Sequence, residues 1–90
     1  MNTAKTYTSV EQDFINTLVA SLPPVIARKD VRRFLGGVVS PQTLSNADAA
    51  GVGPAVAYRV GRTVIYRTES LAKWVVERFG VVRIANLKTL

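Results

Sequence analysis

Basic side chains that can bind phosphate are concentrated in the middle of this 90-residue sequence. Positions 28–67 contain seven bases and two acids, a net charge of +5 within a total of +6 for the chain. The seven bases are Arg28, Lys29, Arg32, Arg33, Arg59, Arg62 and Arg67. Guanidinium and ammonium groups pair with phosphate oxygens, so this distribution favours a polyanionic partner, most simply a nucleic acid.

A polar stretch without any Lys or Arg separates the basic residues that end at Arg33 from those that begin at Arg59. Within this stretch the candidates for contacting DNA bases are Gln42, Thr43, Ser45 and Asn46. Amide side chains can hydrogen-bond to N6 and N7 of adenine, and hydroxyl groups can reach bases or phosphates. Asp48 would be repelled by phosphates, so we expect it to accept from a cytosine amino group or to pair with an arginine of the protein.

Enzymatic and metal-dependent functions find little support in the composition. The sequence contains no cysteine and no histidine, which removes thiolate ligands, the commonest metal ligand and the commonest general base. Gly51, Gly53 and Pro54 lack the spacing and the following Lys-Ser/Thr of a nucleotide-binding loop, so they are interpreted as backbone-shaping residues. We therefore expect no catalysis, no cofactor, no metal and no small-molecule substrate.

The first predicted element is an amphipathic helix over residues 9–22, after a polar N-terminus of residues 1–8 that is expected to be flexible. Ser9 and Gln12 have the spacing of a capping box, and the Pro23-Pro24 pair ends the helix. Apolar residues recur along it at spacings of three and four, as on one face of a helix. They are Val10, Phe14, Leu18, Val19 and Leu22. This stripe is predicted to join the core, with a dimer contact as the alternative.

Two short helices follow, at residues 28–35 and 41–50. The first is broken by Gly36-Gly37, and the second begins with Ser40 as its cap and Pro41 at its first position. Two helices joined by a glycine-bearing turn suggest a helix-turn-helix, in which the second helix enters the major groove of DNA.

A β-hairpin is predicted over residues 55–67, since Gly61 and Arg62 alone separate two runs rich in β-branched and aromatic residues. Glycine at the first central position suits a type II′ turn. Thr68 is interpreted as the N-cap of a last helix over residues 69–79. The large aromatic residues of this region are interpreted as packing residues rather than base-stacking platforms: Tyr58, Tyr66 and Trp74.

The order helix, turn, helix, hairpin, helix predicts an α+β, mostly helical domain over residues 9–80. The expected architecture is a winged helix-turn-helix with an added N-terminal helix, the hairpin being the wing. The tail, residues 81–90, is half apolar, and it is expected to dock as a strand or an arm in preference to being disordered.

Four short segments resemble a known family: SPQTLSNAD, GVGP, YRVGRTVIYR and ESLAKWVVER. With them, the run of residues 25–79 resembles the excisionase and AlpA-like DNA-binding proteins of phages and mobile elements. The fold of that group is similar to the DNA-binding domain of MerR-type regulators. The resemblance implies sequence-specific binding of double-stranded DNA, in transcriptional control or in directing site-specific recombination.

The expected contacts fall into two sets. Base readout is assigned to Gln42, Thr43, Ser45 and Asn46. Phosphate or wing contacts are assigned to Arg28, Lys29, Arg32, Arg33, Ser40, Arg59, Arg62, Thr63 and Arg67. One such domain covers a single half-site, so a homodimer or tandem binding is expected.

The predicted helix over residues 41–50 contains no Lys or Arg, which leaves open an alternative function as a protein-interaction module on a winged-helix scaffold. Without a membrane span or a secretory signal in the sequence, the expected location is cytoplasmic.

Overall fold

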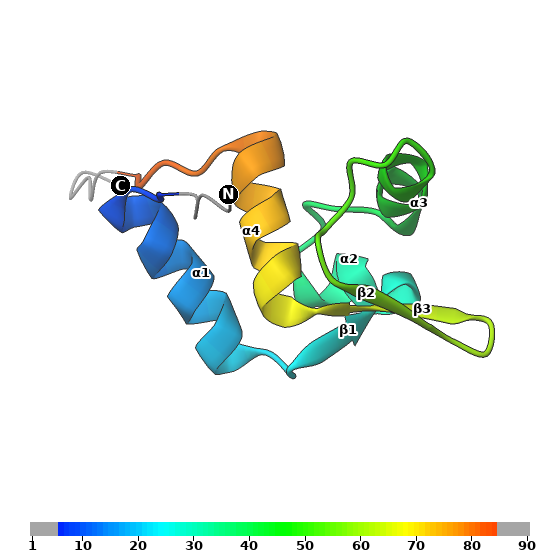
Figure 1. The fold of residues 1–90 in the computed structure, drawn as a ribbon. Coiled ribbons are helices and arrows are strands. Elements are labelled where there is room, and N and C mark those ends of the chain that lie inside the picture. Colours follow the sequence, from blue (N-terminus) through cyan, green and yellow to red (C-terminus); the bar gives the residue numbers. More distant parts are fainter. Residues whose placement is uncertain (1–5, 85–90) are drawn as a thin grey trace.

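The structure is a computed structural model, and it describes residues 6–84 (Figure 1). Within these residues the chain forms an α+β fold with four α-helices and a three-stranded antiparallel sheet. The elements in order are α1 (Ser9–Ser21), β1 (Val25–Ala27), the 3₁₀ turn η1 (Arg28–Asp30), α2 (Val31–Phe34), α3 (Pro41–Ala49), β2 (Ala57–Val60), β3 (Thr63–Arg67) and α4 (Thr68–Phe79).

The predicted hairpin is present as β2 and β3, with Gly61 and Arg62 in the turn between them. Gly61 has φ of 62° and Arg62 does not have a positive φ, which agrees with the type II′ geometry expected from the sequence. The strand before the turn begins at Ala57, two residues later than predicted. Short β1, which the sequence did not indicate, pairs with β3 and makes the order β1-β3-β2.

The core lies between the sheet and the helices. Tyr66, Leu44 and Leu71 are completely buried in it, and Trp74 is 7% exposed. The predicted core role of the α1 stripe is confirmed for three residues, because Phe14 and Leu18 pack against both hydrophobic clusters and Leu22 packs against one of them. It is wrong for Val19, which is 46% exposed. A further α1 residue outside the predicted stripe, Ile15, is buried in a cluster with Ala72 and Val76 of α4. Helices α1 and α4 lie side by side (Figure 1).

Two of the predicted helix caps are wrong, and one is confirmed. At α1 the capping box is formed by Thr8 and Glu11, one residue before the Ser9 and Gln12 pair. Thr68 lies inside the first turn of α4, because burial directs its hydroxyl to donate to the carbonyl of Pro23 instead of capping the helix. Ser40 does cap α3, accepting from the amide of Thr43 at 3.1 Å, with Pro41 at the first helical position.

The two ends of the described chain lie near α1 and α4. The Tyr7 hydroxyl donates to Glu77 of α4 at 2.6 Å, so this residue of the expected flexible N-terminus has a defined contact. Residues 81–84 form no strand; Val81 packs beside α1, while Val82 and Ile84 are exposed. The rest of the predicted tail, residues 85–90, lies outside the described residues.

No helix within residues 6–84 is long and apolar enough to cross a membrane.

Candidate nucleic-acid interface

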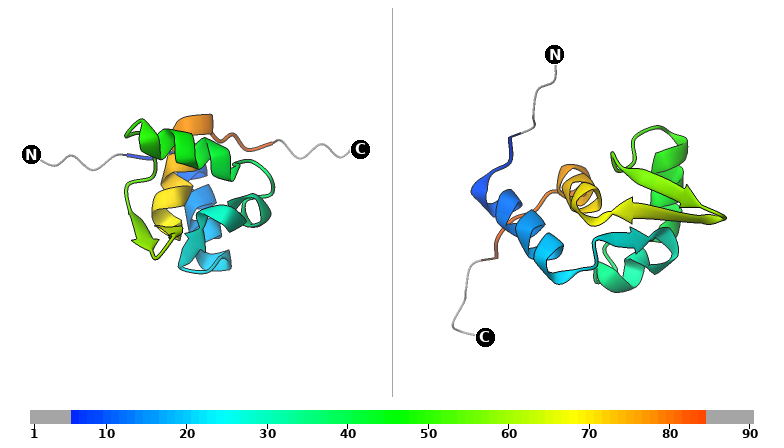
Figure 2. Two further views of the ribbon diagram at one scale, coloured as in Figure 1. Left: turned by 90° about the vertical axis from the view of Figure 1, so that its right-hand side faces the viewer. Right: turned by 60° about the horizontal axis from the view of Figure 1, so that its bottom comes forward.

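A basic pocket joins three elements that are far apart in the sequence. It has a volume of about 200 Å³ and is lined by Arg28, Lys29, Pro41, Arg62, Thr63 and Val64. These residues bring together η1, the first residue of α3 and the tip of the hairpin. Helix α3 and the hairpin tip lie at the same end of the molecule, on the right in Figure 1 and toward the viewer in the left panel of Figure 2. The structure therefore brings the start of the polar helix to Arg62.

Helix α3 is anchored by one face and presents the other to solvent. Leu44 and Ala47, three residues apart, are buried in the core. Gln42 and Asn46 are exposed, and the Gln42 amide nitrogen donates to the Asn46 side-chain oxygen at 2.9 Å. This contact orients both amides and leaves the oxygen of Gln42 and the nitrogen of Asn46 available to a partner.

The other polar residues of this helix are less available. Thr43 and Ser45 are half-buried, and the Thr43 hydroxyl lies 2.9 Å from the hydroxyl of the capping residue Ser40. Ser40 and Thr43 therefore stabilise the start of α3 itself. Of the four residues predicted to read bases, Gln42 and Asn46 are the exposed pair.

The register of the hairpin separates its arginines. Residues paired across antiparallel strands point to the same face, so Arg59 lies on the face of Val64. Val64 lines the basic pocket, and this face is turned toward α3. Arg67 lies on the opposite face, where its guanidinium donates to the Tyr58 hydroxyl at 3.2 Å. Arg59 is thus on the same face of the hairpin as Val64 but does not line the pocket, and Arg67 is on the opposite face.

The two arginines of α2 are exposed but do not line the pocket. The Arg33 guanidinium carbon lies 5.1 Å from the centre of the Phe34 ring, and Arg32 projects from the same short helix. Both add positive charge beside η1. Of the predicted phosphate contacts, Arg28, Lys29, Arg62 and Thr63 are therefore the residues that share one pocket.

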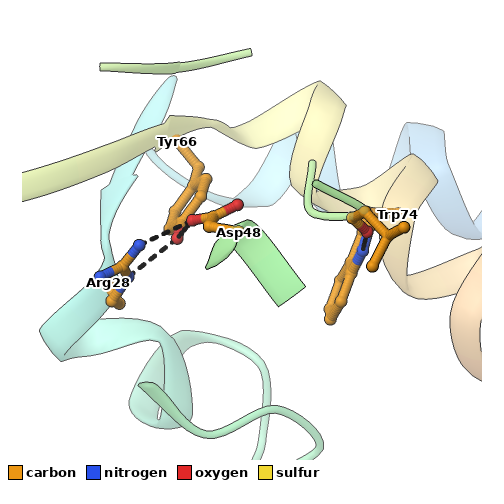
Figure 3. Close-up of polar contacts among 5 residues, drawn as sticks. Arg28, Asp48, Tyr66 and Trp74 are labelled. Atoms are coloured by element: carbon orange, nitrogen blue, oxygen red, sulfur yellow. Dashed lines mark hydrogen bonds and ion pairs between the residues drawn. The ribbon is translucent and has the colours of Figure 1, made fainter. Parts of the chain in front are cut away.

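Asp48 is held by two partners inside the protein (Figure 3). Its Oδ2 lies 2.7 Å from Nη2 of Arg28 and accepts from the Tyr66 hydroxyl at 2.5 Å. Nε of Arg28 also donates to the Tyr66 hydroxyl at 2.9 Å, which closes a three-membered network. Of the partners considered for Asp48 from the sequence, the structure shows an arginine of the protein. Tyr66 is a buried packing residue, as predicted, and in addition a polar link between α3 and β3.

The network stabilises the protonated forms of Tyr66 and Arg28. Burial and the hydrogen bond to Asp48 raise the pKa of Tyr66 to about 12, so its hydroxyl stays protonated and can donate. Burial alone would lower the pKa of Arg28, but its hydrogen bonds to Tyr66 and Asp48 outweigh burial and raise that pKa. Arg28 is therefore cationic at neutral pH, with Asp48 as its ion-pair partner.

Tyr66 makes the stability of the fold sensitive to alkaline pH. Its pKa rises from 10.0 to about 12 on folding, so the folded state favours the protonated hydroxyl. The resulting stabilisation is complete below pH 10 and disappears as the pH rises toward 12, a loss of about 2 to 3 kcal/mol. Urea unfolding of the wild type and Tyr66→Phe should therefore show a stability difference that narrows over this range. A stability difference that stays constant from pH 10 to 12 would contradict the assignment of this loss to Tyr66. Tyr7, whose pKa is also raised, is present in both proteins and so does not contribute to the difference.

The loop after α3 is attached to α4 by a second polar contact. The indole nitrogen of Trp74 donates to the carbonyl of Val52 at 2.8 Å (Figure 3). This contact satisfies the polar atom of a nearly buried ring and confirms the predicted core position of Trp74. Together with the Asp48 network, it holds both the end of α3 and the loop that follows.

A scan against protein-family models and searches of curated proteins and of solved structures found no match to this chain. Within residues 6–84, no group of three or more acidic, cysteine or histidine side chains is placed to hold a metal ion.

Proposed function

We propose that this protein binds double-stranded DNA sequence-specifically, as a transcriptional regulator or an excisionase-like recombination directionality factor of a phage or mobile element. In this proposal η1, α2 and α3 form the helix-turn-helix, α3 is the recognition helix and the β2–β3 hairpin is the wing. The observation that carries it is the pocket shared by Lys29, Arg62 and the start of the exposed helix α3. A basic pocket beside a polar helix suits a backbone phosphate at the rim of a groove.

The two kinds of contact divide between different elements. Phosphates are assigned to Lys29 and Arg62 in the pocket, with Arg59, Arg32 and Arg33 around it. Bases are assigned to Gln42 and Asn46, whose mutual hydrogen bond leaves one acceptor and one donor toward the partner. Adenine presents the complementary donor N6 and acceptor N7 in the major groove. Their exposure supports this role, because Leu44 and Ala47 hold the opposite side of α3 in the core and leave Gln42 and Asn46 free to contact a partner.

Salt dependence is the first property to test. If about four to six phosphates are contacted, log affinity should fall against log salt with a slope of roughly −4 to −5. Because one domain covers one half-site, a second copy or a tandem site is proposed to supply further affinity. Weak binding that is insensitive to salt, or no binding to any duplex, would remove the proposal.

Arg62→Ala and Asn46→Ala should separate backbone contacts from base contacts. Arg62→Ala is expected to weaken binding to all duplexes alike, since a phosphate carries no sequence information. Asn46→Ala is expected to cost about 1 to 3 kcal/mol on the preferred site only. Fluorescence anisotropy with the preferred duplex and a scrambled duplex measures both effects. Equal losses of Asn46→Ala on the two duplexes would exclude it as a base reader.

A protein-interaction module on the same scaffold is the second candidate. It is favoured by the absence of Lys and Arg from α3 and by apolar residues exposed on the outer face of the sheet. On that face Val25, Tyr58 and Val60 are 42%, 45% and 61% exposed. Co-purification of a tight protein partner without nucleic acid would select this candidate over DNA binding.

A further inference from the structure

Arg28 takes part both in the basic pocket and in the hydrogen-bond network with Asp48 and Tyr66. It forms part of the wall of the basic pocket, together with Lys29 and Arg62. Its Nε and Nη2 atoms nevertheless point to the Tyr66 hydroxyl and the Asp48 carboxylate (Figure 3). The side chains of Arg28 and Asp48 remain 24% and 26% exposed. The charge of Arg28 is thus at the pocket, but an acid of α3 balances it.

Asp48 is the one charged residue of α3, and its sign opposes DNA binding. A carboxylate near a phosphate weakens binding to every duplex, whatever the sequence. The same carboxylate links α3 to η1 through Arg28 and to β3 through Tyr66. It therefore lowers the sequence-independent attraction while it fixes the helix that carries Gln42 and Asn46.

We propose that Asp48 determines the specificity of DNA binding without touching DNA. It keeps Arg28 from acting as a free phosphate-binding cation, and it positions α3 for reading bases. This inference rests on the proposed function, and it identifies the residue that limits binding to unrelated sequences. Asp48 is a positioning residue, since it acts through Arg28 and Tyr66.

If the network only maintained the fold, its disruption would change binding to unrelated DNA in the opposite direction from the one proposed here. Damage to the fold would weaken binding to all duplexes, whereas release of Arg28 strengthens binding to unrelated DNA. Asp48→Asn tests this difference, because it replaces the carboxylate by a neutral amide of the same shape, which holds Arg28 more weakly, while its oxygen can still accept from Tyr66. Asp13→Asn is the matched control: it makes the same change in net charge at an exposed position of α1.

The test uses a duplex of about 20 base pairs recovered by the wild-type protein from a randomised library, and a scrambled duplex of equal length. Asp48→Asn is expected to bind the scrambled duplex about three- to tenfold more tightly at low salt. Its salt slope should become steeper by about one, as for one additional phosphate contact. The preferred-to-scrambled affinity ratio should fall, because the added phosphate contact strengthens binding to both duplexes, whereas the weaker link between α3 and η1 lowers base readout on the preferred duplex only. Asp13→Asn should leave the ratio and the slope close to the wild type.

Arg28→Gln completes the test, and its effect in the wild-type background does not depend on the folding of Asp48→Asn. In the wild-type background it should change the salt slope on the scrambled duplex by less than about 0.5, whereas Lys29→Gln should change it by about one. In the Asp48→Asn background Arg28→Gln should remove the added slope. Tyr66→Phe keeps the ion pair, so it should bring no gain on the scrambled duplex.

The outcomes distinguish the inference from the proposed function. If the wild type selects a site and Asp48→Asn binds all duplexes more weakly, or behaves as Asp13→Asn does, the inference is overturned and DNA binding stands. An equal change of slope for Arg28→Gln and Lys29→Gln in the wild-type background also overturns it. If the wild type shows no salt-dependent binding to either duplex, the proposed function and the inference both fail.

Discussion

Replacing Lys29 and Arg62 together by alanine is expected to weaken binding to every duplex by about 50- to 100-fold at about 0.1 M salt. Both side chains line the basic pocket at the start of α3, one from η1 and one from the hairpin turn. Each phosphate contact adds a slope of about −0.9 to the salt dependence, so the double variant should lose about two units of slope. Fluorescence anisotropy at a series of salt concentrations measures the affinity and the slope together.

The control is a second double variant, Lys73→Ala with Arg83→Ala, which lowers the net charge equally. Lys73 pairs with Glu69 on α4 at 3.2 Å, and Arg83 lines a different pocket beside α1. This variant should lose less than about threefold in affinity, because neither residue lines the basic pocket and salt screens charges that do not contact the phosphates. Similar losses in the two double variants would show that binding follows net charge and would refute the pocket as the binding site.

Gly53→Ala is expected to destabilise the fold by about 2 to 4 kcal/mol. A Cβ atom at this position would lie 1.8 Å from Oδ1 of Asp48 and 2.9 Å from its Cγ. The carboxylate would have to leave, and Arg28 and Tyr66 would then lose their partner in a partly buried site. Urea unfolding followed by circular dichroism gives the change in the free energy of unfolding.

The cause of that loss can be checked with a second substitution. In an Asp48→Ala background the atoms that obstruct the new Cβ are absent, so Gly53→Ala should cost less than about 0.5 kcal/mol. Gly51→Ala in the same loop is a separate comparison. Its added Cβ meets no atom within 4 Å, but its φ of 78° should cost about 1 to 2 kcal/mol in either background. Additive effects of Gly53→Ala and Asp48→Ala would show that the steric explanation is wrong.

Elements encoded by neighbouring residues were predictable from the sequence. Ser40 and Pro41 specify the start of α3, and Gly61 specifies the turn of the hairpin, because cap and turn geometry depend on a few adjacent residues. Leu44 and Ala47 form the buried face of α3, and their spacing of three residues is that of one face of a helix. The polar residues that remain on the opposite face, Gln42 and Asn46, follow from the same period.

Elements that depend on distant residues were not predictable in this way. Strand β1 has three residues, too few for a periodic pattern, and it exists because Ile26 pairs with Tyr66 of β3. Thr68 has the residue type of a cap, but burial and the carbonyl of Pro23 give its hydroxyl another partner. The alternation along β3 puts Arg67 on one face, and only the packing shows that this face is turned away from α3.

The sequence alone determined the order of the four helices and the hairpin, the excess of positive charge and the polar side chains available on α3. Tertiary structure decided which charges act together: Arg28, Lys29 and Arg62 share a pocket, while Asp48 balances one of them. The physical reason is the range of the interactions. Caps, turns and amphipathic periods act over a few residues, whereas an ion pair such as Arg28–Asp48 forms only after the core has brought its partners together.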